Sequence, residues 1–463
     1  MDLHQIKKEI HRDPILSKLS RVAKENDVSL FLVGGYLRDR FIGMGGRDYD
    51  FTLPKKASSH IAMIEDTLQL RFFKVGKEER NTTTYRIVKE DLSMDLTFLQ
   101  GETIEEDLQK RDFTINAIAF SLKDEIFHWV KGSLEDLKEK VIRPVSSHSI
   151  DQDPLRMLRA IRYLCTLNDF VMEKGLKEEI SLKKEKILGL PGERVKSELD
   201  QILLSPQPFL GMKTLYESDL LLTLFPELKG LENLGQNEHH HLRVLHHTLL
   251  MIEKIEWALE WTVQHHREIS LTREDRLSLY YAALFHDIGK QDTYARDEKG
   301  KVHFYYHETF SVQAAEGMME RLRFSNLMKN KILRLIKSHM RVLNLSRETK
   351  ETALKRLMNQ MGEDTPLLIL MTLADKEASR GILSVQMDEV VEKHCLRILE
   401  LFNEKEIIYP PPLVSGHDVM ALGYSSGPRV GKILDFIRQK QVEGEIKNRE
   451  EALSILKEKF GIE

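Results

Sequence analysis

A glycine pair between an apolar run and a charged helical run most constrains how this chain begins to fold. Residues 30–33 (LFLV) predict a short buried strand, Gly34 and Gly35 predict a turn, and residues 36–42 (YLRDRFI) predict a helix. A glycine turn that opens a helix exposes backbone N–H groups to which a phosphate can bind. Glycine pairs open many helices, so an ordinary turn is the alternative for this segment alone.

Two carboxylates follow directly, in the run DYDFTL. Residues two apart on a strand point to the same face, so Asp48 and Asp50 are predicted to lie side by side. Adjacent carboxylates repel each other unless a positive charge lies between them. A pair of Mg²⁺ ions meets that need and would hold an attacking hydroxyl and a triphosphate for in-line displacement. Asp95, in the later run MDLTF, is a candidate third carboxylate, and a solvated turn is the alternative for DYD by itself.

The pattern of apolar residues divides the chain into a mixed first part and a helical remainder. Strand-like runs (LFLV, YDFTL, TYRIV, MDLTFL and IFHWV) alternate with helical runs up to about residue 145, which indicates an α/β or α+β domain. From about Ile150 onward, apolar residues recur at i, i+3, i+4 and i+7, as in DPLRMLRAIRYLCTL and ERVKSELDQILL. One mixed N-terminal domain followed by all-helical modules is therefore expected.

Composition limits where such a protein can act. Of the 463 residues, 41% are apolar and 31% are charged, which is enough apolar content for sizeable cores. No apolar run approaches the roughly 20 residues of a membrane span, and the N-terminus lacks the apolar stretch of a secretory signal. The two cysteines, Cys165 and Cys395, are too far apart in sequence to indicate a disulfide framework or a cysteine zinc site. A cytoplasmic protein with no membrane partner is expected.

Motifs along nearly the whole chain resemble one known family. GGYLRDRFIG and RDYDF, then KRDFTINAIAF at residues 110–120, DPLRMLRAIRY at 153–163 and GERVKSEL at 192–199, occur in this order. They resemble the class II tRNA nucleotidyltransferase and bacterial poly(A) polymerase family, and the resemblance continues through an HD-type region to residues 413–434. It implies an α+β fold with a polymerase-β-type nucleotidyltransferase head. The implied parts are the head (1–145), a helical neck for nucleotide recognition and RNA binding (146–235), an HD-type helical domain (236–405) and a helical tail (406–463).

The resemblance also implies an activity and its residues. The enzyme would add CMP, with AMP as a further option, to tRNA 3′ ends from CTP and ATP by template-independent two-metal transfer. The catalytic carboxylates would be Asp48 and Asp50, which bind Mg²⁺, together with Asp95. The other implied residues contact the nucleotide: Gly34, Gly35 and Arg38 at the triphosphate, Arg111, Asp112 and Asn116 at the base, ribose and phosphates, Asp153 and Arg156 at the base, and Arg159 and Arg162 toward the phosphates.

Asp153 and Arg156 also fit base reading on chemical grounds. Placed i, i+3 on one helix, they would be neighbours on its surface. A carboxylate only accepts hydrogen bonds and a guanidinium only donates them. Cytosine and adenine each present an amino donor beside a ring-nitrogen acceptor, whereas uracil and guanine present the reverse. The pair would therefore take C and A and reject U and G, and an ordinary surface salt bridge is the alternative.

One departure from the family pattern concerns the segment between the third carboxylate and the basic motif. CCA-adding members usually carry a flexible loop there. Here only residues 96–110 separate Asp95 from Arg111, and they predict a short turn and the start of a helix. That shortening resembles CC-adding enzymes, which leave the final A to a partner enzyme; full CCA addition, with another segment replacing the loop, is the alternative. Poly(A) polymerase is disfavoured because no Arg-rich strand occurs around residues 72–77.

A second set of chemistry-bearing residues lies in the histidine-rich middle of the chain. His286-Asp287 occurs in the apolar run AALFHDIGK, which predicts a helix around the dipeptide, with His247 upstream and Asp375 downstream. This order resembles HD-type phosphohydrolases, in which two histidines and two aspartates bind a divalent metal. Imidazoles with carboxylates suit a divalent transition metal such as Mn²⁺, Ni²⁺, Co²⁺ or Fe²⁺.

Two further histidines, His307 and His339, match positions seen in some of these domains. The implied reaction is hydrolysis of a phosphomonoester or a 2′,3′-cyclic phosphate, and a retained but inactive scaffold is the alternative. The second HD dipeptide, His417-Asp418, lacks partners of this kind in the sequence and is predicted to be structural.

Two other classes of function stay open on the sequence alone. One is an HD phosphohydrolase whose head only binds RNA, and the other is a non-catalytic RNA-binding protein; the intact Asp48 and Asp50 pair argues against both. The formal net charge of −4, from 69 basic and 73 acidic residues, argues against a strong field for nucleic acid. A tRNA partner would then be bound mainly through its folded shape and local arginines, with a shallower salt dependence than for a strongly basic protein.

Overall fold

In the computed structural model, the contacts between residues group the chain into two units. One comprises Met1–Leu190 with Ser218–Leu220, and the other comprises Pro191–Glu217 with Leu221–Glu463. A mixed sheet with helices forms the first unit and helices dominate the second, which confirms the α+β fold. The finer division into four parts stays a prediction. The structure describes residues 2–46, 48–75, 83–89, 92–235, 243–266, 269–345, 351–379, 385–403, 411–442 and 444–461, without the side chains of 385–388.

A seven-stranded sheet lies at the centre of the first unit. Its order is β3-β4-β5-β2-β1-β6-β7; β2 and β5 run parallel and the other neighbours are antiparallel. Five strands coincide with the strand-like runs of the sequence, and β3 and β6 lie outside those runs. The strands are β1 (Phe31–Val33), β2 (Asp48–Leu53), β3 (Phe73–Val75), β4 (Thr84–Lys89), β5 (Leu92–Phe98), β6 (Ile118–Ser121) and β7 (Phe127–Trp129).

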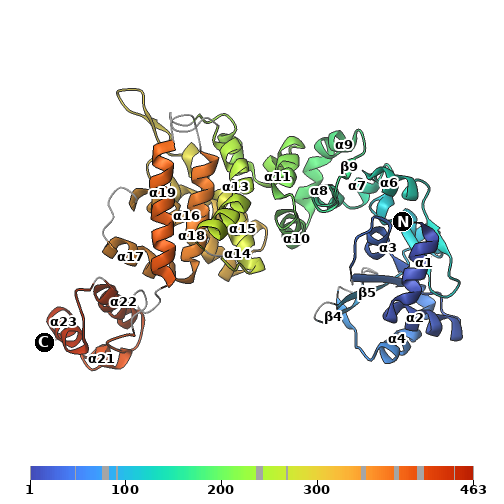
Figure 1. Ribbon diagram of the computed structural model, residues 1–463, viewed down its shortest axis with the longest axis horizontal. Helices are drawn as coiled ribbons and strands as arrows, with labels where there is room; N and C mark the ends of the chain where they lie inside the picture. Colours follow the sequence, from blue (N-terminus) through green and yellow to red (C-terminus); the bar gives the residue numbers. More distant parts are fainter. Residues whose placement is uncertain are drawn as a thin grey trace. The chain divides into compact units, whose positions relative to one another are not determined.

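Helices pack around this sheet and continue beyond it within the first unit. α2 packs against both α1 and α4, and α3 packs against β1 and β2 (Figure 1). The short parallel strands β8 and β9 form a separate pair. The bounds are α1 (Leu3–Arg12), α2 (Pro14–Glu25), α3 (Gly35–Phe41), α4 (Ile61–Leu68), α5 (Ile104–Gln109), α6 (Ser133–Glu139), α7 (Ser149–Gln152), α8 (Arg156–Thr166), α9 (Leu176–Lys183), β8 (Val141–Ile142) and β9 (Val171–Met172), with 3₁₀ turns η1 (Lys55–His60), η3 (Thr114–Asn116) and η4 (Lys184–Gly189).

Alternation along β2 sets the position of the two carboxylates. Tyr49 is buried on one face, so Asp48 and Asp50 lie on the other. Tyr49 stacks on Tyr36 of α3 with ring centroids 5.1 Å apart, and both tyrosine hydroxyls donate to the carboxylate of Asp13. The same carboxylate caps the N-terminus of α2. These contacts hold α3 against β2 and so fix the glycine turn relative to the carboxylates.

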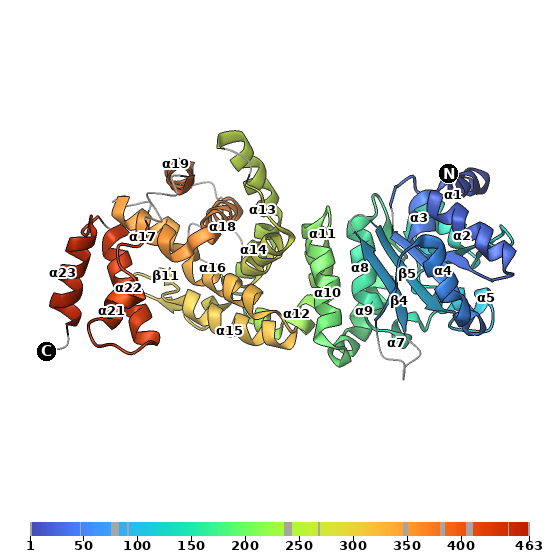
Figure 2. The same ribbon diagram turned by 90° about the horizontal axis from the view of Figure 1, so that it is seen from below.

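A bundle of long helices forms the centre of the second unit (Figure 2). α13 packs against α14 and α18, and α16 packs against α14, α15 and α18. A hairpin of β10 and β11 precedes α15. The bounds are α10 (Gly192–Leu203), α11 (Pro208–Glu217), α12 (Leu220–Leu224), α13 (Val244–His265), α14 (Arg273–Phe285), β10 (Ala295–Arg296), β11 (Val302–His303), α15 (His307–Arg321), α16 (Asn326–Leu345), α17 (Glu351–Met361), α18 (Thr365–Ala378), α19 (Val385–Asn403), α21 (Gly416–Met420), α22 (Pro428–Val442) and α23 (Arg449–Phe460), with 3₁₀ turns η5 (Pro226–Leu231), η6 (Ile288–Gln291) and η7 (Gly362–Asp364).

The first HD dipeptide lies at the end of a helix, so the prediction that a helix surrounds it is wrong. α14 ends at Phe285, His286 is its C-cap, and Asp287 precedes the turn η6. Gly289 lets the chain pass directly under the start of α15, because a Cβ atom there would lie 2.2 Å from the carbonyl oxygen of His307. The tight passage brings Asp287 close to α15.

The second HD dipeptide has a structural role, as predicted. Ser415 and Asp418 form a reciprocal capping box at the start of α21. Arg449 of α23 pairs with the other oxygen of Asp418 at 2.6 Å. The dipeptide therefore ties together two of the helices α21–α23, whose core includes Val419 and Leu456.

Neither a membrane-spanning helix nor an exposed cysteine occurs among the described residues. No helix within the described ranges is long and apolar enough to cross a membrane. Cys165 and Cys395 are both buried and in the thiol form. Burial raises the pKa of Cys395 to about 12, so this thiol is uncharged at neutral pH.

Candidate functional site

Three carboxylates converge on one face of the sheet in the first unit. Asp48 and Asp50 share a face of β2, and Asp50 lies directly opposite Asp95 in the parallel pairing of β2 with β5. Burial raises the pKa of Asp50 to about 6; Arg111 opposes the rise, and the negative charges of Asp95 and Asp48 add to it. Because burial and the two neighbouring carboxylates both disfavour the charged form of Asp50, the three side chains suit a divalent cation such as Mg²⁺.

Arg86, which the sequence analysis missed, holds the third carboxylate. Its Nε and Nη2 atoms donate to the two oxygens of Asp95 at 2.7 and 2.5 Å. This bidentate arrangement fixes the plane of the guanidinium group relative to that of the carboxylate. The spacing of the two strands in the sequence could have predicted this contact. β4 ends at Lys89 and β5 begins at Leu92, so the antiparallel register that pairs these two also sets Arg86 opposite Asp95.

The glycine turn brings the main chain close to Asp50 and Arg111. Gly34 has φ 71° and ψ −127°, a conformation that only glycine adopts without strain. A Cβ atom at Gly34 would lie 3.1 Å from Nη1 of Arg111 and 3.5 Å from an oxygen of Asp50. The main chain at the start of α3 can therefore approach a ligand held by the carboxylates, as the sequence predicts for a triphosphate.

A polar network joins the predicted nucleotide residues of the two motifs that follow. Nη1 of Arg38 donates to Oδ1 of Asn116 at 2.8 Å, and Nδ2 of Asn116 donates to Oδ1 of Asp112 at 3.0 Å. Arg159 pairs with the other oxygen of Asp112 at 2.8 Å. Burial works to raise the pKa of Asp112, but Arg159 and Asn116 hold it below its usual value. Asp112 is therefore a charged, buried anchor that orients two cationic side chains.

Tyr163, also missed from the sequence, gathers three of the predicted arginines. The guanidinium carbons of Arg38, Arg159 and Arg162 lie 5.1, 6.0 and 4.6 Å from the centroid of its buried ring. Its hydroxyl also accepts a hydrogen bond from Arg159 at 3.1 Å. The spacing of Tyr163 four residues after Arg159, on one face of α8, was the available signal.

Asp153 and Arg156 do not share a helix, so that part of the prediction is wrong. α7 ends at Gln152, Asp153 is extended with φ −145° and ψ 102°, and α8 begins at Arg156. Pro154 explains the break, because the residue before a proline is driven out of the helical region. Asp153 instead accepts from the N–H of Leu155 at 3.2 Å.

Arg156 is anchored by its guanidinium in the same region. Nη1 donates to Oγ of Ser149 at 2.8 Å, and Nη2 donates to the carbonyl oxygen of Lys110 at 2.5 Å. These bonds connect the start of α8 to the start of α7 and to the end of α5. The role of Asp153 and Arg156 in base reading stays a prediction.

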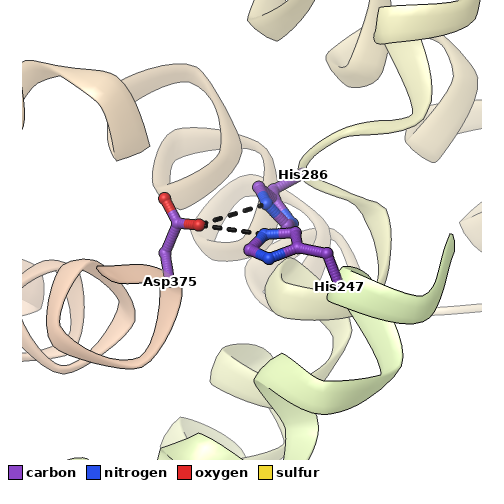
Figure 3. A group of neighbouring side chains, drawn as sticks. All are labelled: His247, His286 and Asp375. Atoms are coloured by element: carbon purple, nitrogen blue, oxygen red, sulfur yellow. Dashed lines mark ion pairs between the residues drawn. The ribbon is translucent and has the colours of Figure 1, made fainter. Parts of the chain in front are cut away.

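A second cluster lies in the helical unit and brings together the predicted metal ligands. Nε2 of His247, on α13, lies 3.0 Å from Oδ1 of Asp375, on α18, and Nε2 of His286 lies 4.0 Å from the same oxygen (Figure 3). Asp287 lies 3.2 Å from His286 and 3.3 Å from His307, the first residue of α15. All five side chains are buried or nearly so.

The hydrogen bonds of three histidines direct their lone pairs into this cluster. The Nδ1 atoms of His286, His307 and His339 lie 2.8, 2.8 and 2.6 Å from main-chain carbonyl oxygens, so each Nδ1 carries the proton. When these rings are neutral, each Nε2 is then an acceptor, and those of His307 and His339 face each other at 3.1 Å. Acceptors facing acceptors and carboxylates need a cation among them, so this donor set fits a divalent transition metal.

Lys290 supplies part of the positive charge in the cluster and was not predicted. Its Nζ lies 2.6 Å from Oδ2 of Asp287. Several groups hold the pKa of Asp287 well below its usual value against the effect of burial: a protonated His286 contributes most, then Lys290, so a proton on His286 supplies part of the charge that a metal would otherwise supply. The position of Lys290 three residues after Asp287, in the turn η6, was the sequence signal.

Family models match three successive parts of the chain. A poly(A) polymerase head-domain model matches residues 30–143. A model described as a probable RNA and SrmB-binding site of polymerase A matches residues 169–231, and an HD-domain model matches residues 238–379.

Two relatives and two solved structures extend these matches over almost the full length. The chain is 31% identical to the A-adding tRNA nucleotidyltransferase of Deinococcus radiodurans, over 91% of this chain and 93% of that protein. It is 32% identical to the CC-adding tRNA nucleotidyltransferase of Thermus thermophilus, over 92% of each. A CCA-adding enzyme in its apo form shares the fold with a TM-score of 0.62 at 21% identity, covering 98% of this chain and 97% of the other. The Thermotoga maritima CCA-adding enzyme complexed with tRNA does so with a TM-score of 0.60 at 22% identity and the same coverage.

Gly34→Ala tests the demand for glycine at the turn. The strained backbone is expected to cost about 1 to 3 kcal/mol, which lowers the Tm of the first unit by roughly 3 °C per kcal/mol. Gly35→Ala is the matched control, because its Cβ atom would meet Arg38 at an ordinary 3.6 Å and its φ is not left-handed. Thermal unfolding followed by circular dichroism measures both. Equal Tm values for the two variants would contradict the account of Gly34.

Arg86→Met tests whether the carboxylates lack positive charge. The substitution removes the bidentate partner of Asp95. Losing this partly exposed ion pair is expected to cost about 1 kcal/mol of folding free energy. The Tm of the first unit should therefore fall by a few degrees in metal-free buffer. Adding Mg²⁺ should recover much of that loss, since the cation supplies the missing charge. Arg86→Lys, which keeps the charge, should show a smaller fall. A fall in Tm that Mg²⁺ does not reduce would contradict the prediction.

Proposed function

This chain belongs to the class II tRNA nucleotidyltransferase and poly(A) polymerase family, and we propose that within it the chain is a CC-adding enzyme that transfers CMP from CTP to tRNA 3′ ends. It is a nucleotidyltransferase of the group whose members add C, A or both to tRNA. The A-adding and CC-adding relatives are similar to almost the same degree, 31% and 32% identity. Support for the subtype therefore comes from the loops of the chain itself.

Neither connection around the third carboxylate has room for a long loop. Residues 99–103 join β5 to α5, where Thr103 caps the helix, so the predicted turn and helix are confirmed. On the other side of β5, two residues separate its start from the end of β4. Neither connection can therefore provide the flexible loop that would change the nucleotide pocket between C and A addition, which supports CC addition. Full CCA addition and A addition are the alternatives.

The carboxylates would carry the transfer chemistry. Asp48 and Asp50 would hold Mg²⁺, which when bound supplies charge for the triphosphate and for the attacking 3′-hydroxyl. Asp95, oriented by Arg86, adds a third carboxylate beside Asp50. Arg111, near Asp50, offers a cation on the side of Gly34.

The arginines around Tyr163 would bind the phosphates. Asp112 and Asn116 hold Arg38 and Arg159 in one arrangement. These long side chains therefore lose their conformational entropy on folding and not when phosphate binds. Asp153 would accept from the amino group of the incoming base and Arg156 would donate to its ring nitrogen. Because Ser149 and Lys110 anchor Arg156, we expect a rigid reader of the base.

The central experiment offers labelled CTP or ATP to tRNA that lacks CCA, ends in C or ends in CC. A CC-adding enzyme incorporates C into the first two substrates and leaves tRNA ending in CC unchanged with either nucleotide. Incorporation of A into tRNA ending in CC would contradict the subtype: with C addition it identifies a CCA-adding enzyme, and without it an A-adding enzyme.

Asp48→Asn with Asp50→Asn tests the role of the carboxylates in that assay. The amides keep the shape of the side chains but bind Mg²⁺ poorly, so incorporation is expected to fall at least 10³-fold, on the order of 4 kcal/mol of transition-state stabilisation. Asp66→Ala, at an exposed carboxylate of α4 that pairs with Arg71, is the matched control. Unchanged incorporation by the double variant would overturn the assignment.

For the helical unit we propose metal-dependent hydrolysis of a phosphomonoester or a 2′,3′-cyclic phosphate. The observation that carries it is the convergence of histidine Nε2 atoms and two aspartates in one buried cluster. His247, His286, Asp287 and Asp375 would hold the metal, which when bound activates water and stabilises the charge on the phosphate. Lys290 would help to bind the phosphate.

His286→Ala with Asp287→Ala is expected to abolish metal-dependent phosphatase activity and metal retention while leaving CMP incorporation within twofold of wild type. Elemental analysis after exposure to Mn²⁺ measures retention separately from activity. His417→Ala, at the exposed second HD dipeptide, is the matched control. Retained hydrolysis in the double variant would contradict the assignment.

A further inference from the structure

Four large aromatic side chains are exposed around the hairpin that precedes α15. Tyr305 and Tyr306 are 68% and 75% exposed, and Tyr294 and Phe310 are 40% and 42% exposed. Tyr294, Tyr305 and Tyr306 flank the hairpin of β10 and β11, and Phe310 lies in the first turn of α15. Exposed aromatic rings that gather in one region mark a binding surface. We call these four residues the aromatic patch.

Phe304 connects this patch to the metal-binding cluster. Its ring centroid lies 5.9 Å from that of Tyr294 and 5.4 Å from Nζ of Lys290. Its carbonyl oxygen accepts the Nδ1 hydrogen of His307 at 2.8 Å. Lys290 in turn pairs with Asp287. Phe304 therefore contacts two residues of the metal-binding cluster, His307 and Lys290, and one ring of the aromatic patch, that of Tyr294.

Tyr306 has a backbone conformation that a tyrosine adopts only at a cost in free energy. Tyr306 has φ 63° and ψ 19°, the left-handed region, which asparagine or glycine adopts at lower cost than a bulky residue. It directly precedes His307, so the two Cα atoms are about 3.8 Å apart. Because the ring is largely exposed, packing does not explain a tyrosine at this strained position.

Positive charge accompanies the rings. The guanidinium of Arg296 lies 5.8 Å from the ring of Tyr294, and its Nε donates to the tyrosine hydroxyl at 2.6 Å. The carboxylate of Asp297 accepts from the main-chain N–H groups of Lys299 and Lys301 and so is occupied inside the hairpin turn. Aromatic faces beside cations are the surface on which nucleobases stack while their phosphates are neutralised.

We propose that the aromatic patch stacks the base of a nucleotide whose phosphate enters the HD cluster. This inference rests on the hydrolysis proposed for the cluster. Water adds to phosphorus, the bond from phosphorus to the ribose oxygen breaks, and that oxygen leaves with a proton, which gives inorganic phosphate and a free hydroxyl. Stacking tolerates any base, so little preference among the four is expected.

Hydrolysis of two substrates by the Mn²⁺-loaded full chain tests the proposal. Cytidine 3′-monophosphate carries a base, and glycerol 2-phosphate is a phosphomonoester of a secondary alcohol without one. Tyr305→Ala with Tyr306→Asn should raise the KM for the nucleotide about tenfold or more, with kcat within twofold, and leave glycerol 2-phosphate unchanged. Asparagine suits the left-handed backbone, so folding is maintained. Tyr305→Trp alone keeps an aromatic ring and should leave the KM for the nucleotide unchanged, and Phe73→Ala, at a 51% exposed ring on β3, is the matched control.

Equal effects on both substrates, or no effect on the nucleotide, would overturn the role of the patch. If the wild-type chain hydrolyses neither substrate, the proposed hydrolysis is wrong, and a binding measurement then decides on the patch. For that measurement, calorimetry follows binding of the dinucleotide CpC with a 3′-phosphate to the same Mn²⁺-loaded proteins. Binding that weakens at least tenfold in the tyrosine variant supports the patch, and unchanged binding overturns it.

Discussion

Repulsion between carboxylates on the parallel strands β2 and β5 is the constraint around which the first unit is arranged. The pairing sets Asp50 opposite Asp95, with Asp48 on the same face, and burial of Asp50 adds to the electrostatic cost. Arg86 and Arg111 supply only part of the balancing charge. The shortage favours a divalent cation with its triphosphate at this position, and the glycine turn gives that ligand access to the main chain at the start of α3.

The helical unit meets a similar requirement with different groups. Main-chain carbonyls at the ends of helical turns fix the protons of His286, His307 and His339 on Nδ1, which turns three Nε2 acceptors toward Asp287 and Asp375. A preorganised set of imidazoles selects softer divalent metals than a set of carboxylates does. Under the functions proposed above, the two clusters would hold different metals in one chain and would serve different phosphoryl reactions.

Local motifs predicted both clusters, whereas contacts made across strands or through helix ends escaped the sequence analysis. The convergence of the carboxylates of β2, and that of the histidines and aspartates of the second cluster, could be predicted because residue type and order carry their chemistry. Arg86 was missed because its role depends on the register of a hairpin. The helix expected to include Asp153 ends before it, since Pro154 excludes the helical conformation there, and apolar periodicity alone does not locate such a break.

Net charge alone is a weak guide to the partner, because the acidic residues include carboxylates that converge on β2 and β5 or that anchor arginines, as Asp112 does with Arg159. The claim that the carboxylates of β2 form the catalytic metal site is tested most directly by anomalous diffraction from crystals of the full chain with Mn²⁺ and a non-hydrolysable CTP analogue. The account predicts anomalous peaks between the carboxylates of Asp48 and Asp50 and the triphosphate. Mn²⁺ confined to the HD cluster, with the nucleotide bound away from β2, would contradict it.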